Sequence, residues 1–306
     1  MDIVEPGTPL PTVKNYKPAL RKGEEHAATF IYCDVRQPIE LEKVDITPDD
    51  VIFNFAAVHR TPGHPDPAYF ETNIRGAENV CAFAERHGIR KIVFTSSIAP
   101  YGAAEELKEE TTLPMPNTPY GISKLVAEKI HQTWQAGGEG RQLTIVRPGV
   151  VFGRGENGNF TRLYWGIRGH KFMYPGRKDT IKACIYVKEL VRFMLYRLEH
   201  HDSGVELYNC CYEPAYTIEH IVESMKRVTN MKVKVPFMPG WLIMTAAGIA
   251  GALGSPMGIC PARVRKLQIS TNICGKKLSA SGYRFHYTFE EALADWYKDN
   301  GNLYLQ

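Results

Sequence analysis

Several features that define other protein classes are missing from this chain. No internal repeat or low-complexity tract occurs, and 44% hydrophobic with 23% charged residues excludes a disordered, collagenous or coiled-coil protein. There is no marked excess of one charge, because 37 Lys and Arg against 33 Asp and Glu give a net charge of +4. We therefore expect no nucleic-acid partner. A length of 306 residues favours one large domain or a domain with a smaller lobe.

Cysteine is present without the pattern of a disulfide framework. The seven cysteines are an odd number, no Cys-x-x-Cys pair occurs, and a bond between the adjacent Cys210 and Cys211 would be strained. The first residues, MDIVEPG, also lack the basic stretch and apolar run of a secretory signal. We therefore expect reduced thiols and a cytoplasmic location.

One stretch, Val235 to Ala262, carries no charged residue. Its most apolar part, Trp241 to Leu253, is too short to span a bilayer. The preferred interpretation is a buried helix in a substrate lobe, with a membrane-associated helix as the less favoured alternative. Prolines flank the apolar part on both sides: Pro236, Pro239, Pro256 and Pro261.

Short β-branched runs alternate with amphipathic helices through the first two thirds of the chain. We predict strands at 51–55, 92–95 and 143–147, and helices at 73–87 and from Pro119 to Gly137. This alternation predicts an α/β fold with a parallel sheet, which binds ligands beyond the carboxyl ends of its strands. The second helix is expected to bury an apolar face formed by Ile122, Leu125, Val126, Ile130 and Trp134.

The pattern changes after Gly153. Residues 153–180 are rich in Gly, Arg and aromatic residues, and a helix at 188–200 and a strand at 205–210 follow. From Pro214 onward, helical stretches and loops dominate. The sequence therefore predicts a sheet domain and a smaller lobe that is assembled from two separate segments.

The segment Tyr120-Gly-Ile-Ser-Lys124 carries the sharpest chemical signal. Residues four apart share a helix face, so the Tyr hydroxyl and the Lys ammonium can meet in one site. A nearby cation would lower the pKa of the phenol and suit it to proton exchange with a substrate hydroxyl. The spacing alone is weak evidence, and a surface pair at a helix start is the ordinary alternative. Tyr174 and Lys178 repeat the spacing, but the intervening Pro-Gly excludes a helix there.

Two motifs, one before and one after the Tyr-x-x-x-Lys segment, lie at the ends of predicted strands. FTSSIAPYG (94–102) follows a predicted strand, which places Ser96 and Ser97 at its carboxyl end. VRPGVVFGRG (146–155) ends another strand with a Pro-Gly turn. The order is strand, Ser, about twenty residues, Tyr-x-x-x-Lys, strand and Arg-Pro.

With its strands and motifs in this order, the chain resembles the extended short-chain dehydrogenases/reductases, in the NAD(P)-dependent nucleotide-sugar epimerase/dehydratase group. The resemblance runs from Asp2 to about Tyr297. It implies a Rossmann-like doubly wound parallel sheet in residues 1–152 and 181–212, and a smaller, mostly helical substrate lobe in 153–180 and 213–306. The segments that carry it are NFAAVHR (54–60), TNIRGAENV (72–80), YGISKLVAEK (120–129) and IYVKEL (185–190).

The same resemblance implies a set of site residues. Ser97, Tyr120 and Lys124 match the catalytic triad, in which Tyr is the acid/base, Lys tunes it and binds the nicotinamide ribose, and Ser orients the substrate. The expected cofactor is NAD, with NADP as an alternative. The matched cofactor-side positions are Asp2, Asp34, Val35, Ala56, Ala57, Asn73, Tyr120, Lys124 and Pro148.

One family feature has no counterpart in the sequence. The fold holds the pyrophosphate on a glycine-rich turn after its first strand, yet the only early glycines, Gly7 and Gly23, lie in no such turn. Asp2 resembles the acidic residue about twenty positions beyond those glycines, and a carboxylate there favours NAD. The expectation is a chain that begins inside the second strand, without the first strand and its helix. A shortened gene model is the simplest explanation, and a natural variant with weakened cofactor binding is the alternative.

The reaction subtype and substrate are less defined. The family's dehydratases resemble one another in having Asp-Glu after the catalytic hydroxyl residue, where this chain has Ile98 and Ala99, so we expect an epimerase or a keto-reductase. The resemblance implies a nucleotide sugar as the substrate. Arg residues can clamp its diphosphate, although for each of them singly a solvated basic surface is the favoured interpretation. His59 and His64 lack a third ligand, so no metal site is expected. The candidate substrate residues are Arg154, Arg162 and Arg177.

Two other classes compete with this hypothesis. A 3β-hydroxysteroid-dehydrogenase-like enzyme shares Tyr-x-x-x-Lys, and the charge-free stretch 235–262 is compatible with it. A non-catalytic binding protein without the cofactor loop is the third class, which the intact triad disfavours. The oligomeric state stays open, with a homodimer among the alternatives.

Overall fold

The structure is a computed structural model that describes residues 31–41, 44–59, 63–102, 104–202, 204–242, 245 and 268–306. Asp2, the early glycines and most of the charge-free stretch 235–262 lie outside the described residues. The chain forms two compact units. One includes residues up to Pro100 with Pro116–Ile145 and His200–Glu206, and the other contains Tyr101–Met115, Val146–Glu199 and Leu207–Gln306.

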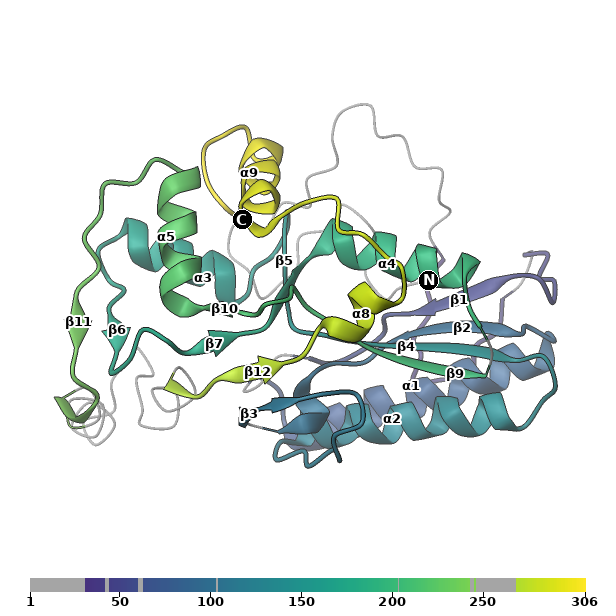
Figure 1. Cartoon of the computed structure of the whole chain (residues 1–306). Coiled ribbons are helices and arrows are strands. Elements are labelled where there is room, and N and C mark those ends of the chain that lie inside the picture. Colours follow the sequence, from purple (N-terminus) through teal and green to yellow (C-terminus); the bar gives the residue numbers. More distant parts are fainter. Residues whose placement is uncertain are drawn as a thin grey trace. The chain divides into compact units, whose positions relative to one another are not determined.

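The first unit is built around parallel strands and two long helices. Four strands form a sheet in the order β1-β2-β4-β9, and β1 and β2 are parallel with Val51 opposite Lys91. The helices α1 (Asp66–Arg86) and α2 (Pro119–Ala136) pack against each other and lie on one face of this sheet (Figure 1). The strands are β1 (Val51–Asn54), β2 (Lys91–Thr95), β4 (Gln142–Pro148) and β9 (Val205–Cys210). These elements confirm the predicted α/β class.

The ends of α1 and α2 follow from local sequence. Thr118 caps α2 by accepting a hydrogen bond from the Gly121 backbone N–H at 3.1 Å, and Pro119 occupies the first turn, where a missing N–H costs nothing. Gly88, at φ 67°, adopts the left-handed conformation just after α1. Helix α1 begins at Asp66, well before the predicted start, because Pro67 is also tolerated in a first turn.

The predicted buried face of α2 is wrong. Ile122 and Val126 are 40% and 37% exposed, and of the five apolar residues expected to be buried only Trp134 is. The side of the helix that faces the protein interior instead carries small and polar residues: Gly121, Ser123, Lys124, Ala127, Glu128, His131 and Trp134. Burial of this polar face places ionisable groups inside the unit, which is unusual unless they have partners.

The second unit contains short strands and five described helices. Strands β5 (Val150–Phe152) and β8 (Cys184–Tyr186) are parallel, and a four-stranded sheet has the order β10-β7-β12-β3. The other strands are β3 (Ala104–Lys108), β6 (Tyr174–Pro175), β7 (Ile181–Lys182), β10 (Tyr216–Thr217), β11 (Phe237–Met238) and β12 (Thr271–Ile273). The helices are α3 (Asn159–Arg168), α4 (Val187–Glu199), α5 (Ile218–Val228), α8 (Lys276–Ala280) and α9 (Phe289–Asp299).

An aromatic core holds the second unit together. Phe152 stacks on Phe160 with ring centroids 4.9 Å apart, and it also contacts Tyr186, Phe289 and Trp296. All five side chains are almost completely buried. Rings of this size bury large apolar areas, so this cluster contributes much of the stability of the unit.

The unit boundaries differ from the predicted domain boundaries. Four segments that were assigned to the sheet domain lie in the second unit: 101–115, 146–152, 181–199 and 207–212. Strands β5 and β8 pair with each other, and α4 follows β8 directly, so these elements stay together within the second unit. Among the described residues, no helix is both long and apolar enough to cross a membrane.

Candidate active site

The structure brings Ser97 and Tyr120 together in the first unit. Ser97 follows β2 at its carboxyl end, and Tyr120 lies in the first turn of α2. The Ser97 hydroxyl lies close enough to the Tyr120 phenol to stabilise its phenolate form, and Ser97 Oγ also accepts a hydrogen bond from the backbone N–H of Ala99 at 3.1 Å. The second contact holds the serine hydroxyl in a fixed place beside the phenol.

Lys124 lies one helical turn after Tyr120. Its Nζ donates a hydrogen bond to the backbone carbonyl of Thr95 at 2.6 Å and lies 4.2 Å from the centroid of the Phe94 ring. The side chain is only 1% exposed. Burial lowers the pKa of Lys124 to about 7, and the negative charge of Glu128 partly opposes this effect.

Burial acts on Tyr120 in the opposite direction from the predicted effect of Lys124. The pKa of Tyr120 is raised, because burial penalises the phenolate more than the neighbouring Ser97 hydroxyl stabilises it. The predicted lowering of this pKa is therefore wrong for the protein alone. Lys124 lies one turn after Tyr120 on α2, and its amino group donates a hydrogen bond to the Thr95 carbonyl rather than to the phenol.

Sequence reasoning missed a row of buried polar residues on α2. Lys124, Glu128 and His131 are spaced i, i+4 and i+7, and none is more than 1% exposed. Ser96 donates a hydrogen bond to Glu128 Oε1 at 2.5 Å, so consecutive residues at the end of β2 contact both Lys124 and Glu128. The available signal was the helical spacing of polar residues after the Tyr-x-x-x-Lys motif.

The predicted cofactor segment 54–60, of which 54–59 are described, begins at the last residue of β1. Ala56 and Ala57 are half-buried, and the Ala56 backbone N–H donates to Asn54 Oδ1 at 3.2 Å. Asn73 fixes the far end, because its amide accepts from the Val58 N–H at 2.8 Å and donates to the Val58 carbonyl at 3.1 Å.

Asn73 also donates to Ser123 Oγ on α2 at 2.8 Å. Its buried amide group is therefore occupied by contacts within the protein, and it connects α1, α2 and the segment after β1.

The predicted adenine-side residues lie next to α1. Asp34 accepts hydrogen bonds from the Arg36 guanidinium, which lowers the pKa of its carboxyl group. Val35 packs closely on Gly76, where a Cβ atom would come within 2.9 Å of Val35 Cγ2. The Val35 carbonyl accepts a hydrogen bond from Asn79 Nδ2 at 2.8 Å.

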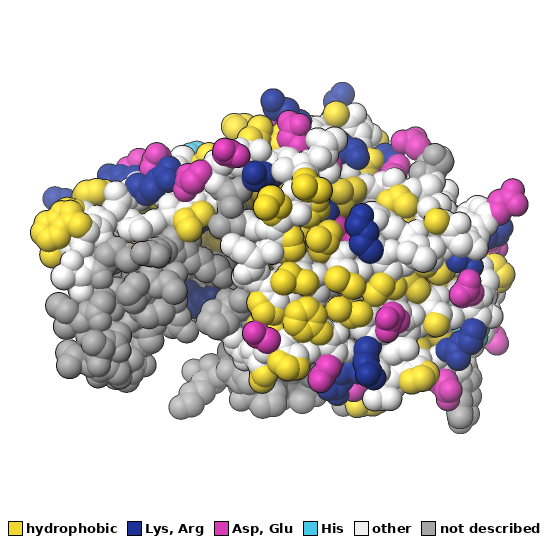
Figure 2. All heavy atoms as spheres, turned by 90° about the horizontal axis from the view of Figure 1, so that it is seen from below, with side chains coloured by type: hydrophobic (Ala, Val, Ile, Leu, Met, Phe, Trp, Pro, Cys, Tyr) yellow, Lys and Arg dark blue, Asp and Glu magenta, His cyan; other side chains and the backbone are white. Residues whose placement is uncertain are grey.

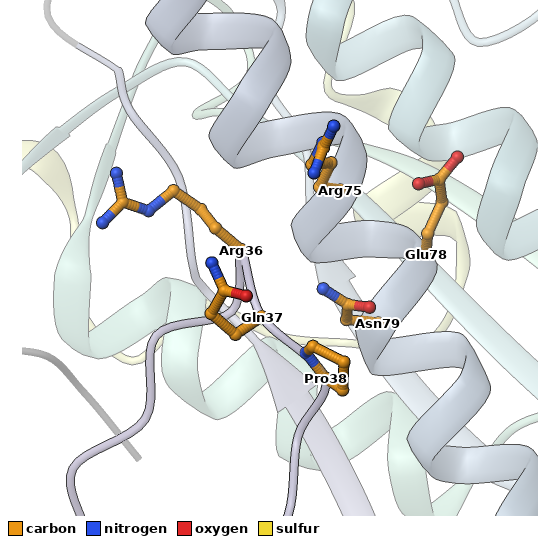
Figure 3. A pocket seen from close by; sticks show the side chains of 6 residues that line it. All are labelled: Arg36, Gln37, Pro38, Arg75, Glu78 and Asn79. Carbon is orange, nitrogen blue, oxygen red and sulfur yellow. The ribbon is translucent and has the colours of Figure 1, made fainter.

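A pocket adjoins this segment (Figure 3). Side chains from the turn after Asp34 face side chains from α1 across it, and two of them are arginines. The charges around it are mixed, because Glu78 also lines the pocket and the Arg36 guanidinium is paired with Asp34. The lining residues are Arg36, Gln37, Pro38, Arg75, Glu78 and Asn79.

The remaining predicted residues belong to the second unit. Pro148 is buried at the end of β4. Arg177 forms ion pairs with Asp179 at 2.8 Å and Glu105 at 3.0 Å, and these hydrogen bonds raise its pKa.

The other two arginines differ from Arg177. Arg162 is exposed and donates to Asn159 Oδ1 at 2.9 Å. The buried Nε of Arg154 has no hydrogen-bond partner among the described residues. In that same part of the chain, no group of three His, Cys, Asp or Glu side chains is arranged to hold a metal.

Comparison with known proteins gives consistent matches. The model of the NAD dependent epimerase/dehydratase family matches residues 4–211. N-acetyl-alpha-D-glucosaminyl-diphospho-ditrans,octacis-undecaprenol 4-epimerase of Escherichia coli O157:H7 is 32% identical over 266 residues, covering 85% of this chain and 80% of the relative. A UDP-glucose 4-epimerase of Lacticaseibacillus casei is 31% identical, covering 72% and 73%.

Solved structures show the same fold. MoeE5 in complex with UDP-glucuronic acid and NAD aligns with a TM-score of 0.65 at 20% identity, covering 88% of this chain and 85% of that protein. RMD from Pseudomonas aeruginosa complexed with NADPH aligns with a TM-score of 0.65 at 18% identity, covering 89% and 91%. At these identities the likeness establishes the Rossmann-like fold.

Proposed function

Because the chain belongs to the NAD-dependent epimerase/dehydratase family, we propose that it oxidises and re-reduces a sugar hydroxyl through Ser97, Tyr120 and Lys124. One observation carries the proposal: the Ser97 hydroxyl lies beside the Tyr120 phenol at the carboxyl end of β2, with the buried Lys124 one turn further along α2. This edge is where parallel sheets bind their ligands.

Tyr120 is the proposed acid/base. Its phenolate form takes the proton of the substrate hydroxyl during oxidation, and the phenol so formed returns a proton to the keto oxygen during reduction. Ser97 Oγ, held by the Ala99 N–H, orients the substrate oxygen toward the phenol. Burial raises the pKa of Tyr120, so catalysis near neutral pH requires added positive charge, which the Lys124 ammonium supplies when it is protonated.

The residues at the nicotinamide end fit the proposed NAD cofactor, which supplies a hydride acceptor when bound. Ala56 and Ala57 have small side chains, which allow close approach to the backbone at the end of β1. Lys124 provides a buried donor for a ribose hydroxyl. NADP is the alternative, because a solved structure of the same fold contains NADPH.

Epimerisation is the proposed reaction, with single reduction of a keto sugar as the alternative. Neither Ile98 nor Ala99, which follow Ser97, carries an acid or base that could remove water. The two relatives described above, at 32% and 31% identity, are both named as 4-epimerases. The proposed substrate is a nucleotide sugar, with its diphosphate bound by arginines of the second unit such as Arg154.

A lipid-linked sugar diphosphate is the second candidate substrate. The relative from Escherichia coli O157:H7 is named for such a substrate, with an undecaprenol chain. In this chain, Phe237 is 51% and Trp241 is 72% exposed at the beginning of the charge-free stretch 235–262. Exposed apolar side chains of this size are suited to contact a hydrocarbon chain.

A substrate screen with two matched variants tests the proposal. Tyr120→Phe removes the reacting hydroxyl, whereas Tyr174→Phe removes a buried hydroxyl from the other Tyr-x-x-x-Lys segment, where no helix runs. The chain is assayed with NAD or NADP against UDP-sugars, a polyprenyl-diphosphate sugar and a sterol. We expect Tyr120→Phe to lower turnover of a diphosphate sugar about 10²–10⁴-fold and Tyr174→Phe to leave it nearly unchanged. Near wild-type turnover by Tyr120→Phe, or turnover of the sterol alone, would contradict the proposal.

We also propose a homodimer formed through the outward faces of α1 and α2. Figure 2 shows apolar side chains gathered over these helices, and Ile122 and Val126 of α2 are among the exposed ones. The helix directs its apolar stripe outward, which would leave an exposed apolar patch on a monomer. A second copy of the same face is self-complementary and would cover it.

A further inference from the structure

A buried hydrogen-bonded link joins the end of β1 to α2. Asn54 is the last residue of β1 and is 5% exposed, and His131 on α2 is fully buried. Asn54 Nδ2 lies 3.2 Å from His131 Nε2, and His131 Nδ1 lies 2.7 Å from the Ala127 carbonyl oxygen. On its other side, Asn54 Oδ1 accepts from the Ala56 N–H at 3.2 Å.

The partners determine the proton positions along this link. A carbonyl oxygen can only accept, so we assign the imidazole hydrogen to Nδ1, which donates to Ala127. His131 Nε2 then has a lone pair and accepts from the Asn54 NH₂ group. This fixes the orientation of the Asn54 amide, and its oxygen must face the Ala56 N–H.

Packing keeps the imidazole in this neutral form. The His131 ring stacks on Phe94 with centroids 4.1 Å apart, and Lys124 Nζ lies over the same Phe94 ring. Burial lowers the pKa of His131 to about 4, with a smaller effect from the positive charge of Lys124. His131 is therefore a neutral acceptor around pH 7.

We infer that His131, acting through Asn54, is a positioning residue for the Ala56–Ala57 segment. The inference deepens the proposed function and rests on it, because that segment is the one we place beside the nicotinamide ribose. Asn73 already fixes the far end of the segment at Val58. With Asn54 held by His131, the short loop is fixed at both ends to the unit that carries the catalytic helix.

His131→Phe is the variant that separates this role from packing. A phenyl ring can still stack on Phe94, but it offers no acceptor, so the Asn54 NH₂ group loses its partner and the amide is free to turn. Trp134→Phe is the matched control, since it changes a buried ring one turn further along α2 whose Nε1 has no hydrogen-bond partner among the described residues. His131→Gln is the conservative variant, because its amide oxygen is an acceptor.

Two measurements are made on the full chain. The first is amide hydrogen exchange at Ala56 without any cofactor. The second is the dissociation constant for NAD by calorimetry, with the KM for the sugar measured beside it. We expect His131→Phe to speed exchange at Ala56 and to weaken NAD binding about five- to hundredfold, the range for leaving a buried donor unpaired. The KM for the sugar should change little, and His131→Gln should recover part of the NAD affinity.

The outcomes separate the inference from the proposed function. Unchanged exchange at Ala56 in His131→Phe, or an equal effect of Trp134→Phe, overturns the inference. If the unsubstituted chain binds neither NAD nor NADP, the proposed function fails, while the exchange result still decides the link. Unchanged NAD affinity in His131→Phe, with affinity intact in the unsubstituted chain, also overturns the inference. Should His131→Phe not fold, Asn54→Ala breaks the same link from the β1 side.

Discussion

Lys124 should make the stability of this protein depend on pH above neutrality. Its side chain is 1% exposed, and burial lowers its pKa from an ordinary value of 10.5 to about 7. Between these two values, the unfolded chain holds a proton on Lys124 and the folded chain does not. The unfolded state therefore binds more protons, and the free energy of unfolding must rise with pH across this interval.

The size of the effect follows from the two pKa values. One extra proton bound by the unfolded state gives a slope of about 1.4 kcal/mol per pH unit. The contribution is fully present above pH 10.5 and is lost as the pH falls through about 7. Between pH 7.5 and 9.5 the free energy of unfolding should gain roughly 2–3 kcal/mol from this residue alone.

Denaturant unfolding of Lys124→Met against the unsubstituted chain isolates this contribution. Other titrating groups largely cancel in the difference between the two proteins, which should grow with pH at the slope given above. Lys129→Met is the control, because it removes an exposed lysine from the same helix and should leave the two curves parallel. Parallel curves for Lys124→Met would refute the reasoning. The same variant should lose activity, since Lys124 is proposed to be catalytic.

Three further predictions concern the site and the surface. Gly121→Ala would place a Cβ atom 2.7 Å from the Ala99 carbonyl oxygen, so we expect about 1–3 kcal/mol of destabilisation by denaturant unfolding, together with lower turnover as the Ser97–Tyr120 contact shifts. Arg154→Ala should raise the KM for a nucleotide sugar roughly ten- to hundredfold in steady-state kinetics, with a smaller change in kcat. Arg177→Ala should change KM much less, because two carboxylates already hold the Arg177 guanidinium. A larger effect of Arg177→Ala than of Arg154→Ala would contradict this prediction. Ile122→Asp should shift the protein from dimer to monomer in analytical ultracentrifugation, and a monomeric unsubstituted protein would disprove the proposed dimer.

Local signals in the sequence were enough to place most elements of the first unit. The predicted strands at 92–95 and 143–147 correspond to Lys91–Thr95 and Gln142–Pro148, and Thr118 caps α2 as expected. The short two-residue strands of the second unit were not predicted, because so few residues carry no periodicity. The unit boundaries also differ from the predicted ones, because the contacts that group 146–152 with 184–199 and 207–306 are long-range and have no local pattern.

Some features of the candidate site were also predictable from the sequence, and others were not. The resemblance carried by the order of the motifs, rather than the Tyr-x-x-x-Lys spacing alone, led to the expectation that Ser97, Tyr120 and Lys124 share a site. The direction of the Tyr120 pKa shift was not predictable from the sequence. The prediction considered only the positive charge of Lys124, whereas burial of the phenol is the larger effect. The link between Asn54 and His131 joins residues 77 positions apart, and no spacing rule connects them.

Helix α2 shows most clearly what each level determined. The sequence by itself determined that 119–136 is an amphipathic helix, because Thr118, Pro119 and Gly137 define its ends and its apolar residues recur at helical spacing. Only the tertiary structure decided which side faces inward, and it buries Lys124, Glu128 and His131 while exposing Ile122 and Val126. The physical reason is that a buried polar side chain is tolerated when partners are in reach, and here Thr95, Ser96 and Asn54 supply them from neighbouring strands. Periodicity reports the existence of two faces, whereas the partners that decide between them come from distant parts of the chain.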